Sequence, residues 1–289
     1  MTMRILVFGE VLWDVFGDKR VIGGAPFNFA AHCARLGAET YLVSAVGNDK
    51  AGADAANEIR AHGIDGRYTA VIDRPTGICE VTLTEGHPEY DLKSGTAYDY
   101  IPCPDTDVVF DALYFGSLAL RGEESRRSLP ELSAKASAAE RFCDINVRQD
   151  FCTDEIISIC LSNATVLKFS REEAGIFGCG SDHTLAAERI LKDFPKIHTV
   201  LVTLDTDGAM AFTRSGRYYA PAERVTPVSS VGAGDSFSAA YLVNRLSGAE
   251  IGKSLSRACA LAGYVVTQLG AVPDYPAELI NRIYPNGGK

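Results

Sequence analysis

Short apolar runs alternate along this chain with longer segments that have the periodicity of helices. The runs at 4–8 and 40–46 are almost continuously apolar, as expected of strands buried on both faces of a sheet. Residues 27–37 and 51–63 have helical patterns that end at glycines. The alternation predicts an α/β fold with a mostly parallel central sheet covered by helices on both sides. Further strands are predicted at 112–118, 141–147, 164–170 and 198–204, and further helices at 123–139 and 185–193.

Two stretches break this rhythm. Residues 11–24 and 66–101 contain shorter runs of alternating polar and apolar positions separated by turn residues. This pattern is typical of antiparallel strands with one open face, and it predicts a small β-sheet that stands off the main body as a lid. No linker, repeat or low-complexity segment divides the chain, so residues 1–289 are predicted to form a single domain.

Composition narrows the class of protein. The apolar content of 46% is sufficient for a large core, and the net charge of −9 argues against nucleic acid or an anionic membrane as a partner. No window approaches the roughly 18 apolar residues of a membrane span, and the N-terminus lacks the features of a signal peptide. The eight cysteines are scattered without a CxxC pair and the five histidines are equally dispersed, so we expect reduced thiols, no zinc site and a cytoplasmic location.

The segment SSVGAGDSFSAAYL, residues 229–242, carries the clearest chemical signal. Gly232, Ala233 and Gly234 precede an apolar helical run, so the free backbone N–H groups of the helix start could approach an anion closely. Asp235 beside them could accept a proton from a hydroxyl group, which together suits phosphoryl transfer to an alcohol. Taken alone, Asp235 is more simply interpreted as a helix cap after a glycine turn, because such caps are common. The P-loop and GxGxxG phosphate-binding motifs are absent from the sequence.

Several motifs together resemble one family. VGAGDSFSAA (231–240) is similar to the C-terminal signature of the ribokinase-like (phosphofructokinase-B) carbohydrate kinases. GEVLWDVFG, IGGAPFNFAAHCARLG, VGNDKAG, DINVR and TQLGAVP resemble further motifs of the family in the expected order, and especially those of its fructokinases. The resemblance covers essentially the whole chain and implies a ribokinase-like three-layer sandwich with a β-sheet lid that excludes water during transfer.

The resemblance also implies roles for individual residues. Asp235 would be the base that deprotonates the sugar hydroxyl, and Gly232, Ala233 and Gly234 would form the anion hole. Asp14 would bind sugar hydroxyls, and Arg148 would lie near the substrate. Gly24 and Asn28 fall where the GGxxxN motif of the family holds the sugar and hinges the lid.

Three positions depart from the family pattern. The NxxE motif reads SREE, with Ser170 in place of asparagine, while Glu173 remains for the magnesium and phosphate shell. The nucleotide-binding TLGxxG reads TLDTDG, which keeps Thr203 and Gly208 but places Asp205 where glycine is expected. Ser229 replaces an aspartate that helps to hold a monovalent cation in relatives, which leaves potassium dependence open.

These observations predict an ATP- and Mg²⁺-dependent sugar kinase, with fructose phosphorylated at its 6-hydroxyl. A 2-keto-3-deoxygluconate kinase is an alternative in which Arg148 would meet the substrate carboxylate. A non-catalytic sugar or nucleotide sensor descended from a kinase is a second alternative, motivated by Ser170, Asp205 and Ser229. The expected partners are a small sugar and ATP, and by analogy a homodimer could form through the lid.

Overall fold

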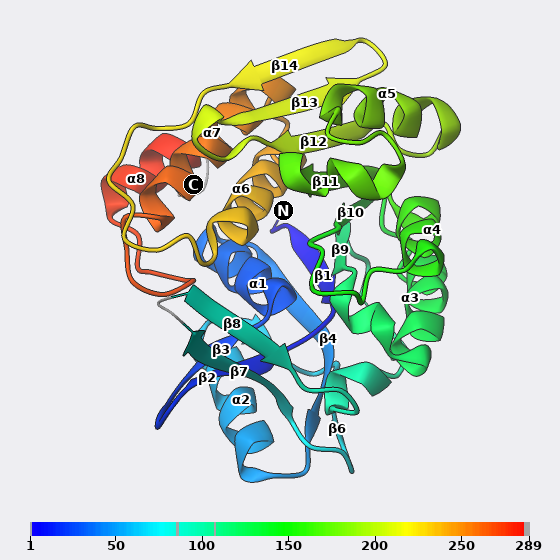
Figure 1. The fold of residues 1–289 in the computed structure, drawn as a ribbon, viewed down its shortest axis with the longest axis vertical. Coiled ribbons are helices and arrows are strands. Elements are labelled where there is room, and N and C mark those ends of the chain that lie inside the picture. Colours follow the sequence, from blue (N-terminus) through cyan, green and yellow to red (C-terminus); the bar gives the residue numbers. More distant parts are fainter. Residues whose placement is uncertain (1, 85–86, 107, 286–289) are drawn as a thin grey trace.

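The main body is built on one large twisted sheet. We describe a computed structural model, which places residues 2–84, 87–106 and 108–285. Within them the strand order of this sheet is β14-β13-β12-β11-β10-β9-β1-β4-β5, with β6 also paired to β4 (Figure 1). The pairings from β12 through β5 and β6 are parallel, whereas β13 and β14 add an antiparallel edge. The strands are β1 (Arg4–Phe8), β4 (Glu39–Gly47), β5 (Ile64–Asp65), β6 (Thr69–Ile72), β9 (Ala112–Gly116), β10 (Glu140–Asp144), β11 (Val166–Ser170), β12 (Thr199–Thr203), β13 (Ala209–Thr213) and β14 (Gly216–Ala220).

Helices cover both faces of this sheet. In β1, Ile5 and Val7 join one apolar cluster while Leu6 and Phe8 join the other, as the two-residue period of a strand requires. One cluster includes α1 (Ala25–Arg35), α2 (Lys50–Ala61), α6 (Ala233–Leu246), α7 (Ile251–Val265) and α8 (Ala277–Ile283). The other includes α3 (Glu123–Lys135), α4 (Asp154–Asn163) and α5 (His183–Asp193). The predicted α/β class, with a mostly parallel sheet between two helical layers, is confirmed.

Short 3₁₀ segments connect several of these elements. They are η1 (Ala97–Tyr100), η2 (Leu118–Arg121), η3 (Arg171–Phe177) and η4 (Asp205–Asp207). Three of them, η2, η3 and η4, begin within two residues of the ends of β9, β11 and β12, at the carboxyl edge of the sheet, where loops carry most binding groups in folds of this kind. No helix in the described ranges is long and apolar enough to cross a membrane. All eight cysteines are free thiols.

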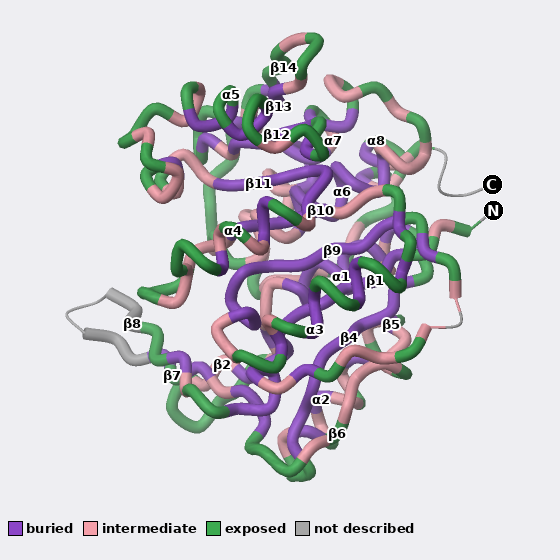
Figure 2. Tube along the Cα trace, turned by 90° about the vertical axis from the view of Figure 1, so that its right-hand side faces the viewer, coloured by how far each residue is buried: buried purple, intermediate pink, exposed green. Residues whose placement is uncertain are grey.

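A second, smaller sheet stands apart from the main one. Its strand order is β3-β2-β7-β8, formed by β2 (Leu12–Phe16), β3 (Lys19–Gly23), β7 (Gly77–Thr84) and β8 (His87–Leu92). It lies below α1 in Figure 1 and projects from the body in Figure 2. Phe16, Val21 and Tyr90 are exposed on it, and dimer formation through this sheet remains a prediction.

Two details of the small sheet differ from the sequence analysis. The stretch 66–101 was expected to lie in the lid, but β6 within it pairs with β4 of the main sheet, where Thr69 Oγ1 donates to the Leu42 carbonyl at 2.9 Å. The central pair β2 and β7 is parallel rather than antiparallel. The chain between them passes through the main body and returns in the same direction, which a parallel pair requires and a hairpin does not.

Candidate active site

The predicted anion-binding turn lies directly at the N-terminus of helix α6. Gly232 is the N-cap with φ +81°, a left-handed conformation that favours glycine, and a Cβ there would overlap the Ala271 carbonyl oxygen. A Cβ at Gly234 would lie only 3.1 Å from Lys168 Nζ. No side chain caps the helix start. Ala233 N donates to the Ser230 carbonyl at 3.3 Å, but Gly232 N and Gly234 N have no recorded partner among the described residues and remain available to an anion. Close packing on both sides explains the small residues at this turn.

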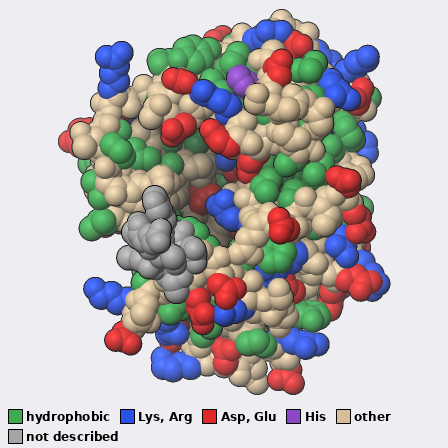
Figure 3. Space-filling model, viewed as in Figure 1, with side chains coloured by type: hydrophobic (Ala, Val, Ile, Leu, Met, Phe, Trp, Pro, Cys, Tyr) green, Lys and Arg blue, Asp and Glu red, His purple; other side chains and the backbone are tan. Residues whose placement is uncertain are grey.

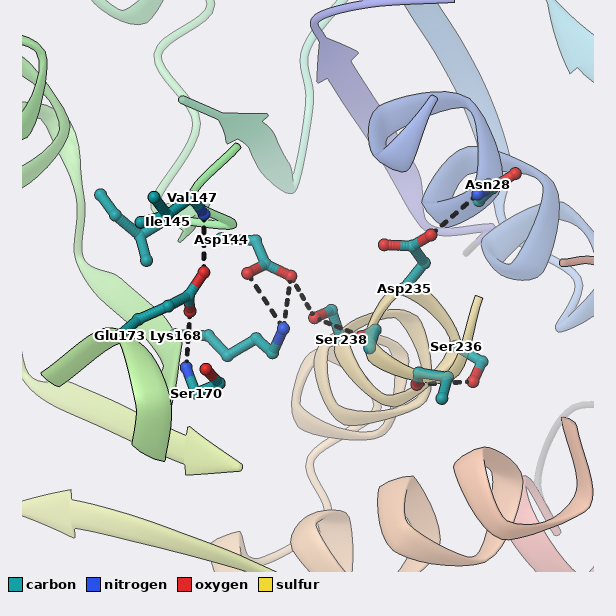
Figure 4. Close-up of polar contacts among 12 residues, drawn as sticks. Asn28, Asp144, Ile145, Val147, Lys168, Ser170, Glu173, Asp235, Ser236 and Ser238 are labelled. Carbon is teal, nitrogen blue, oxygen red and sulfur yellow. Dashed lines mark hydrogen bonds and ion pairs between the residues drawn. The ribbon is translucent and has the colours of Figure 1, made fainter. Parts of the chain in front are cut away.

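Asp235 lies in the first turn of this helix and faces helix α1. Asn28 Nδ2 donates to Asp235 Oδ2 at 2.9 Å, across 207 residues of sequence (Figure 4). Burial raises the pKa of Asp235 to about 6, the Asn28 hydrogen bond opposes this, and the negative charge of Asp144 raises the pKa further. At neutral pH the carboxylate is therefore ionised but more basic than an ordinary aspartate, as a group that must accept a proton should be.

A buried ion pair lies beneath the same turn, and the sequence analysis missed it. Lys168 Nζ donates to the two carboxylate oxygens of Asp144 at 3.0 and 2.8 Å, and Ser238 Oγ donates to Asp144 Oδ2 at 3.1 Å (Figure 4). Burial is the largest single effect and lowers the pKa of Lys168, but the charges of Asp144, Glu173 and Asp235 together with the Asp144 hydrogen bond raise it above its usual value. The ammonium therefore stays charged. The signal in the sequence was a single lysine inside the apolar strand VLKFS.

The residues predicted to bind sugar lie on the other side of Asp235. Gly24, the N-cap of α1, has φ +105°, and a Cβ there would lie 2.6 Å from the Glu10 carbonyl oxygen. A Cβ at Gly23 would lie 2.5 Å from Asp14 Oδ2. The two consecutive glycines therefore leave room for the Glu10 carbonyl and for the Asp14 carboxylate. Burial raises the pKa of Asp14, against the opposing effects of Cys79 and Arg148. Arg148 is exposed, and its charge acts on Asp14 and on Asp235.

Glu10 is a second residue that the sequence analysis overlooked. It follows β1 and is only 3% exposed, and its Oε2 has no hydrogen-bond partner in the described part of the chain. Burial raises its pKa to about 7; the charge of Arg148 opposes this and that of Asp235 adds to it. A carboxylate in GE directly after the first buried strand was the available sequence signal.

Glu173 binds the backbone of the loop that contains Arg148. Its Oε1 accepts a hydrogen bond from Val147 N at 2.6 Å and its Oε2 accepts one from Ser170 N at 2.7 Å (Figure 4). The next residue along that loop, Gln149, has φ +47°, and its Nε2 donates to the Tyr90 carbonyl of strand β8 at 2.6 Å. The loop after β10 therefore connects the candidate site to the small sheet, a contact that the sequence did not indicate.

The predicted nucleotide residues lie at the carboxyl ends of neighbouring strands. Ser170 and Thr203 are register partners in β11 and β12. Asp205 is exposed and has φ +51°, so this position has the left-handed backbone for which glycine is usual. Gly208 has φ +104°, and a Cβ there would overlap the Ala220 carbonyl oxygen. Ser229 Oγ accepts from Val231 N at 3.2 Å and helps to shape the turn before α6.

The chemistry of the donors limits how a metal ion could bind. In the ranges that the structure describes, no group of three or more His, Cys, Asp and Glu side chains could hold a metal ion. Both oxygens of Glu173 already accept backbone hydrogen bonds. Mg²⁺ commonly keeps several waters and binds through substrate phosphates with one or two carboxylates. The residues present therefore fit Mg²⁺ as a companion of nucleotide phosphates and do not form a dedicated cage.

The space-filling view is hollowed between the small sheet and the upper half of the molecule, and acidic and basic side chains gather at this hollow (Figure 3). The arrangement brings together backbone donors, a fixed ammonium and a raised-pKa carboxylate. Donors of this kind stabilise charge on a transferring group while the carboxylate accepts a proton. The site can therefore support transfer of an anionic group to a hydroxyl.

Comparison with known proteins supports this chemistry. A family model described as pfkB family carbohydrate kinase matches residues 3–278. A fructokinase of Rhizobium leguminosarum bv. trifolii is 30% identical over 259 residues, covering 83% of this chain and 79% of that protein. The aminoimidazole riboside kinase of Salmonella typhimurium is 27% identical over 94% of this chain and 92% of its own. The structure of aminoimidazole riboside kinase from Salmonella enterica, complexed with aminoimidazole riboside and an ATP analogue, superposes with a TM-score of 0.82 at 24% identity, covering 97% of this chain and 99% of that one.

Proposed function

The chain belongs to the pfkB family of carbohydrate kinases, and from this premise we propose that it transfers the γ-phosphate of ATP to the 6-hydroxyl of fructose. Family membership makes it a phosphotransferase with an alcohol group as acceptor. The observation that carries the proposal is Asp235, a carboxylate with a pKa of about 6 in the first turn of a helix whose start is open to an anion. Asn28 holds this carboxylate from the side where the sugar would bind.

In the proposed reaction, Asp235 accepts the proton of the sugar hydroxyl as its oxygen attacks the γ-phosphorus. The new bond joins the sugar oxygen to phosphorus, and the bond from phosphorus to the β-γ bridging oxygen breaks, so ADP leaves with that electron pair. The backbone N–H groups of Gly232 and Gly234 and the ammonium of Lys168 stabilise the negative charge on the transferring group, and the N–H of Ala233 joins them when it leaves the Ser230 carbonyl. Mg²⁺ bound with the nucleotide would neutralise further charge on the phosphate oxygens.

Fructose is favoured as acceptor by two observations. The Rhizobium relative at 30% identity is a fructokinase, and the motifs around Asp14 and Arg148 resemble those of fructokinases. We assign sugar binding to Asp14, Gly24, Asn28 and Arg148. We assign nucleotide binding to Ser170, Thr203, Asp205 and Gly208, with Glu173 shaping the phosphate and metal shell through the loops that it braces.

A 2-keto-3-deoxygluconate kinase is the second candidate, and Arg148 is the observation that favours it. The side chain is exposed, and among the described residues its only recorded hydrogen bond goes to the Val147 carbonyl at 3.2 Å. A free guanidinium beside a sugar site suits a carboxylate on the substrate. Acidic sugars should then compete with fructose, and Arg148→Lys should weaken binding of the acid more than that of the neutral sugar.

The test is ADP release by the purified protein with MgATP and a panel of acceptors. The panel contains fructose, ribose, 2-keto-3-deoxygluconate, aminoimidazole riboside, glucose and tagatose, each with and without potassium. Turnover with fructose above the others supports the proposal, and turnover with another acceptor keeps the reaction but changes the substrate. No turnover, with sugar or nucleotide binding intact by thermal shift, would indicate a sensor instead of an enzyme. The paired potassium measurements show whether Ser229 has removed a cation requirement.

A further inference from the structure

The segment between α7 and α8 forms the wall behind the anion-binding turn. The Ala271 carbonyl oxygen occupies the space that a Cβ of Gly232 would need. At the other end of the segment, Val228 N and Ser229 N donate to the Val266 carbonyl at 2.7 and 3.1 Å. Figure 1 shows this segment in orange, between α7 and α8. The position of Gly232, and hence of the free N–H groups of α6, therefore depends on where residues 266–275 lie.

One face of helix α1 holds this wall in place. His32 Nδ1 and the Tyr275 hydroxyl share a short hydrogen bond, and the two rings are nearly parallel at 3°. Arg35 Nη2 donates to the Val272 carbonyl at 3.2 Å, and its Nη1 pairs with Asp274 at 2.5 Å. Residues four and three positions apart lie on the same side of a helix, so Asn28, His32 and Arg35 form one stripe. The stripe runs from the catalytic carboxylate to the wall of the anion site.

His32 is chemically suited to a fixed structural contact. It is fully buried, and burial lowers its pKa to about 3, only partly opposed by the Ala271 backbone carbonyl. The imidazole is therefore neutral at working pH, with one donor and one acceptor nitrogen. Its Nδ1 shares the hydrogen bond with the Tyr275 hydroxyl, whereas its buried Nε2 has no hydrogen-bond partner among the described residues. The Tyr275 hydroxyl is therefore the contact that fixes the imidazole ring against residues 271–275.

We propose that His32 is a positioning residue for nucleotide phosphates, acting through Tyr275 and the Ala271 peptide on the turn at Gly232. This proposal rests on the proposed function, because it takes the anion bound at this turn to be a nucleotide phosphate. Loss of the contact lets residues 271–275 move away from Gly232, and the N–H groups of the turn lose their fixed direction. Nucleotide affinity falls, whereas the sugar residues near Asp14 keep their geometry.

The principal variant is Tyr275→Phe, because it removes only the hydroxyl and leaves the ring beside His32. The probe is MgADP, with its dissociation constant measured by calorimetry, together with the melting temperature and the KM values for ATP and sugar. We expect MgADP to bind about 5-fold more weakly, which is the loss of one ordinary hydrogen bond of about 1 kcal/mol. KM for ATP should rise by a similar factor and KM for sugar should stay within about 2-fold.

Tyr284→Phe is the matched control, since it also removes one tyrosine hydroxyl contact, with Ser247 at 3.0 Å, but far from the anion turn. It should lower the melting temperature without changing MgADP affinity. At His32, the asparagine variant can keep a polar atom near the Nδ1 position and should recover part of the affinity that His32→Leu loses. If His32→Leu fails to fold, Tyr275→Phe still decides the matter.

The proposal is overturned if Tyr275→Phe lowers only the melting temperature and binds MgADP as the unsubstituted protein does. The outcome is separate from that of the acceptor panel. A protein that binds MgADP but phosphorylates no sugar refutes the kinase proposal, yet the Tyr275→Phe comparison remains decisive. A protein that binds no MgADP refutes both.

Discussion

Replacing Asp235 by asparagine should greatly slow the reaction and at the same time stabilise the fold at neutral pH. Asparagine keeps the shape of the side chain and can still accept the hydrogen bond from Asn28 Nδ2, but it cannot accept the proton of a hydroxyl group. Loss of a positioned base typically costs about 10²- to 10⁴-fold in rate. We therefore expect kcat to fall by about that factor, with KM for ATP changed little.

The effect on stability follows from the pKa of Asp235. Burial raises it from 3.8 to about 6, so the folded protein holds a proton that the unfolded chain has released between these pH values. The fold is therefore destabilised as pH rises from about 4 to about 6, and the full effect is present above pH 6. The effect is at most about 3 kcal/mol and, because the residue is only partly buried, about 1–2 kcal/mol after solvent screening. Asp235→Asn should recover this amount at pH 7 and nothing below pH 4.

The assays are steady-state ADP release and urea unfolding at pH 4, 5, 6, 7 and 8 for both proteins. The stability difference should rise from about zero at pH 4 to its full value above pH 6. Near-normal kcat in Asp235→Asn would refute the assignment of the base. A stability difference that is negative at pH 7, or independent of pH, would refute the claim that the ionised Asp235 carboxylate destabilises the fold.

Three further substitutions test the surroundings of this group. Lys168→Met leaves Asp144 buried without its partner, so denaturant titration should show a loss of about 3–5 kcal/mol in the free energy of unfolding. Any folded fraction should turn over about 10²-fold more slowly. Unchanged stability would contradict the buried ion pair. Gly232→Ala should abolish MgATP binding in calorimetry while sugar binding persists, because the new Cβ would overlap the Ala271 carbonyl oxygen; retained nucleotide affinity would show that the turn is not the anion site. Glu10→Gln should stabilise the fold at pH 8 but not at pH 4, since burial raises the pKa of Glu10 to about 7 and its charged form is the costly one; equal urea midpoints at pH 8 would show that the carboxyl group is solvated.

The sequence by itself determined the layered fold and was sufficient to predict the centre of the candidate site. Alternating apolar runs and helical patterns fix which segments bury both faces, and the strands and helices of the main body lie close to the predicted ranges. Gly24, Gly208 and Gly232 could be singled out from the sequence as constrained positions. Their positive φ values and the close approach of backbone atoms restrict these positions to glycine. The chemistry of a carboxylate beside a glycine turn at a helix start is local in sequence, so Asp235 could be predicted as the candidate base.

The tertiary structure alone decided the groups that tune this centre. Asp144 is 24 residues from Lys168 and 94 from Ser238, and His32 is 243 residues from Tyr275. Nothing in the local pattern of either partner specifies the other, because such contacts arise only when β10, β11, α1 and α6 pack together. The parallel pairing of β2 with β7 and the placement of β6 beside β4 are decided in the same way. Burial sets the pKa values of about 6 and 7 at Asp235 and Glu10, and burial is a property of the packed fold and not of the residue.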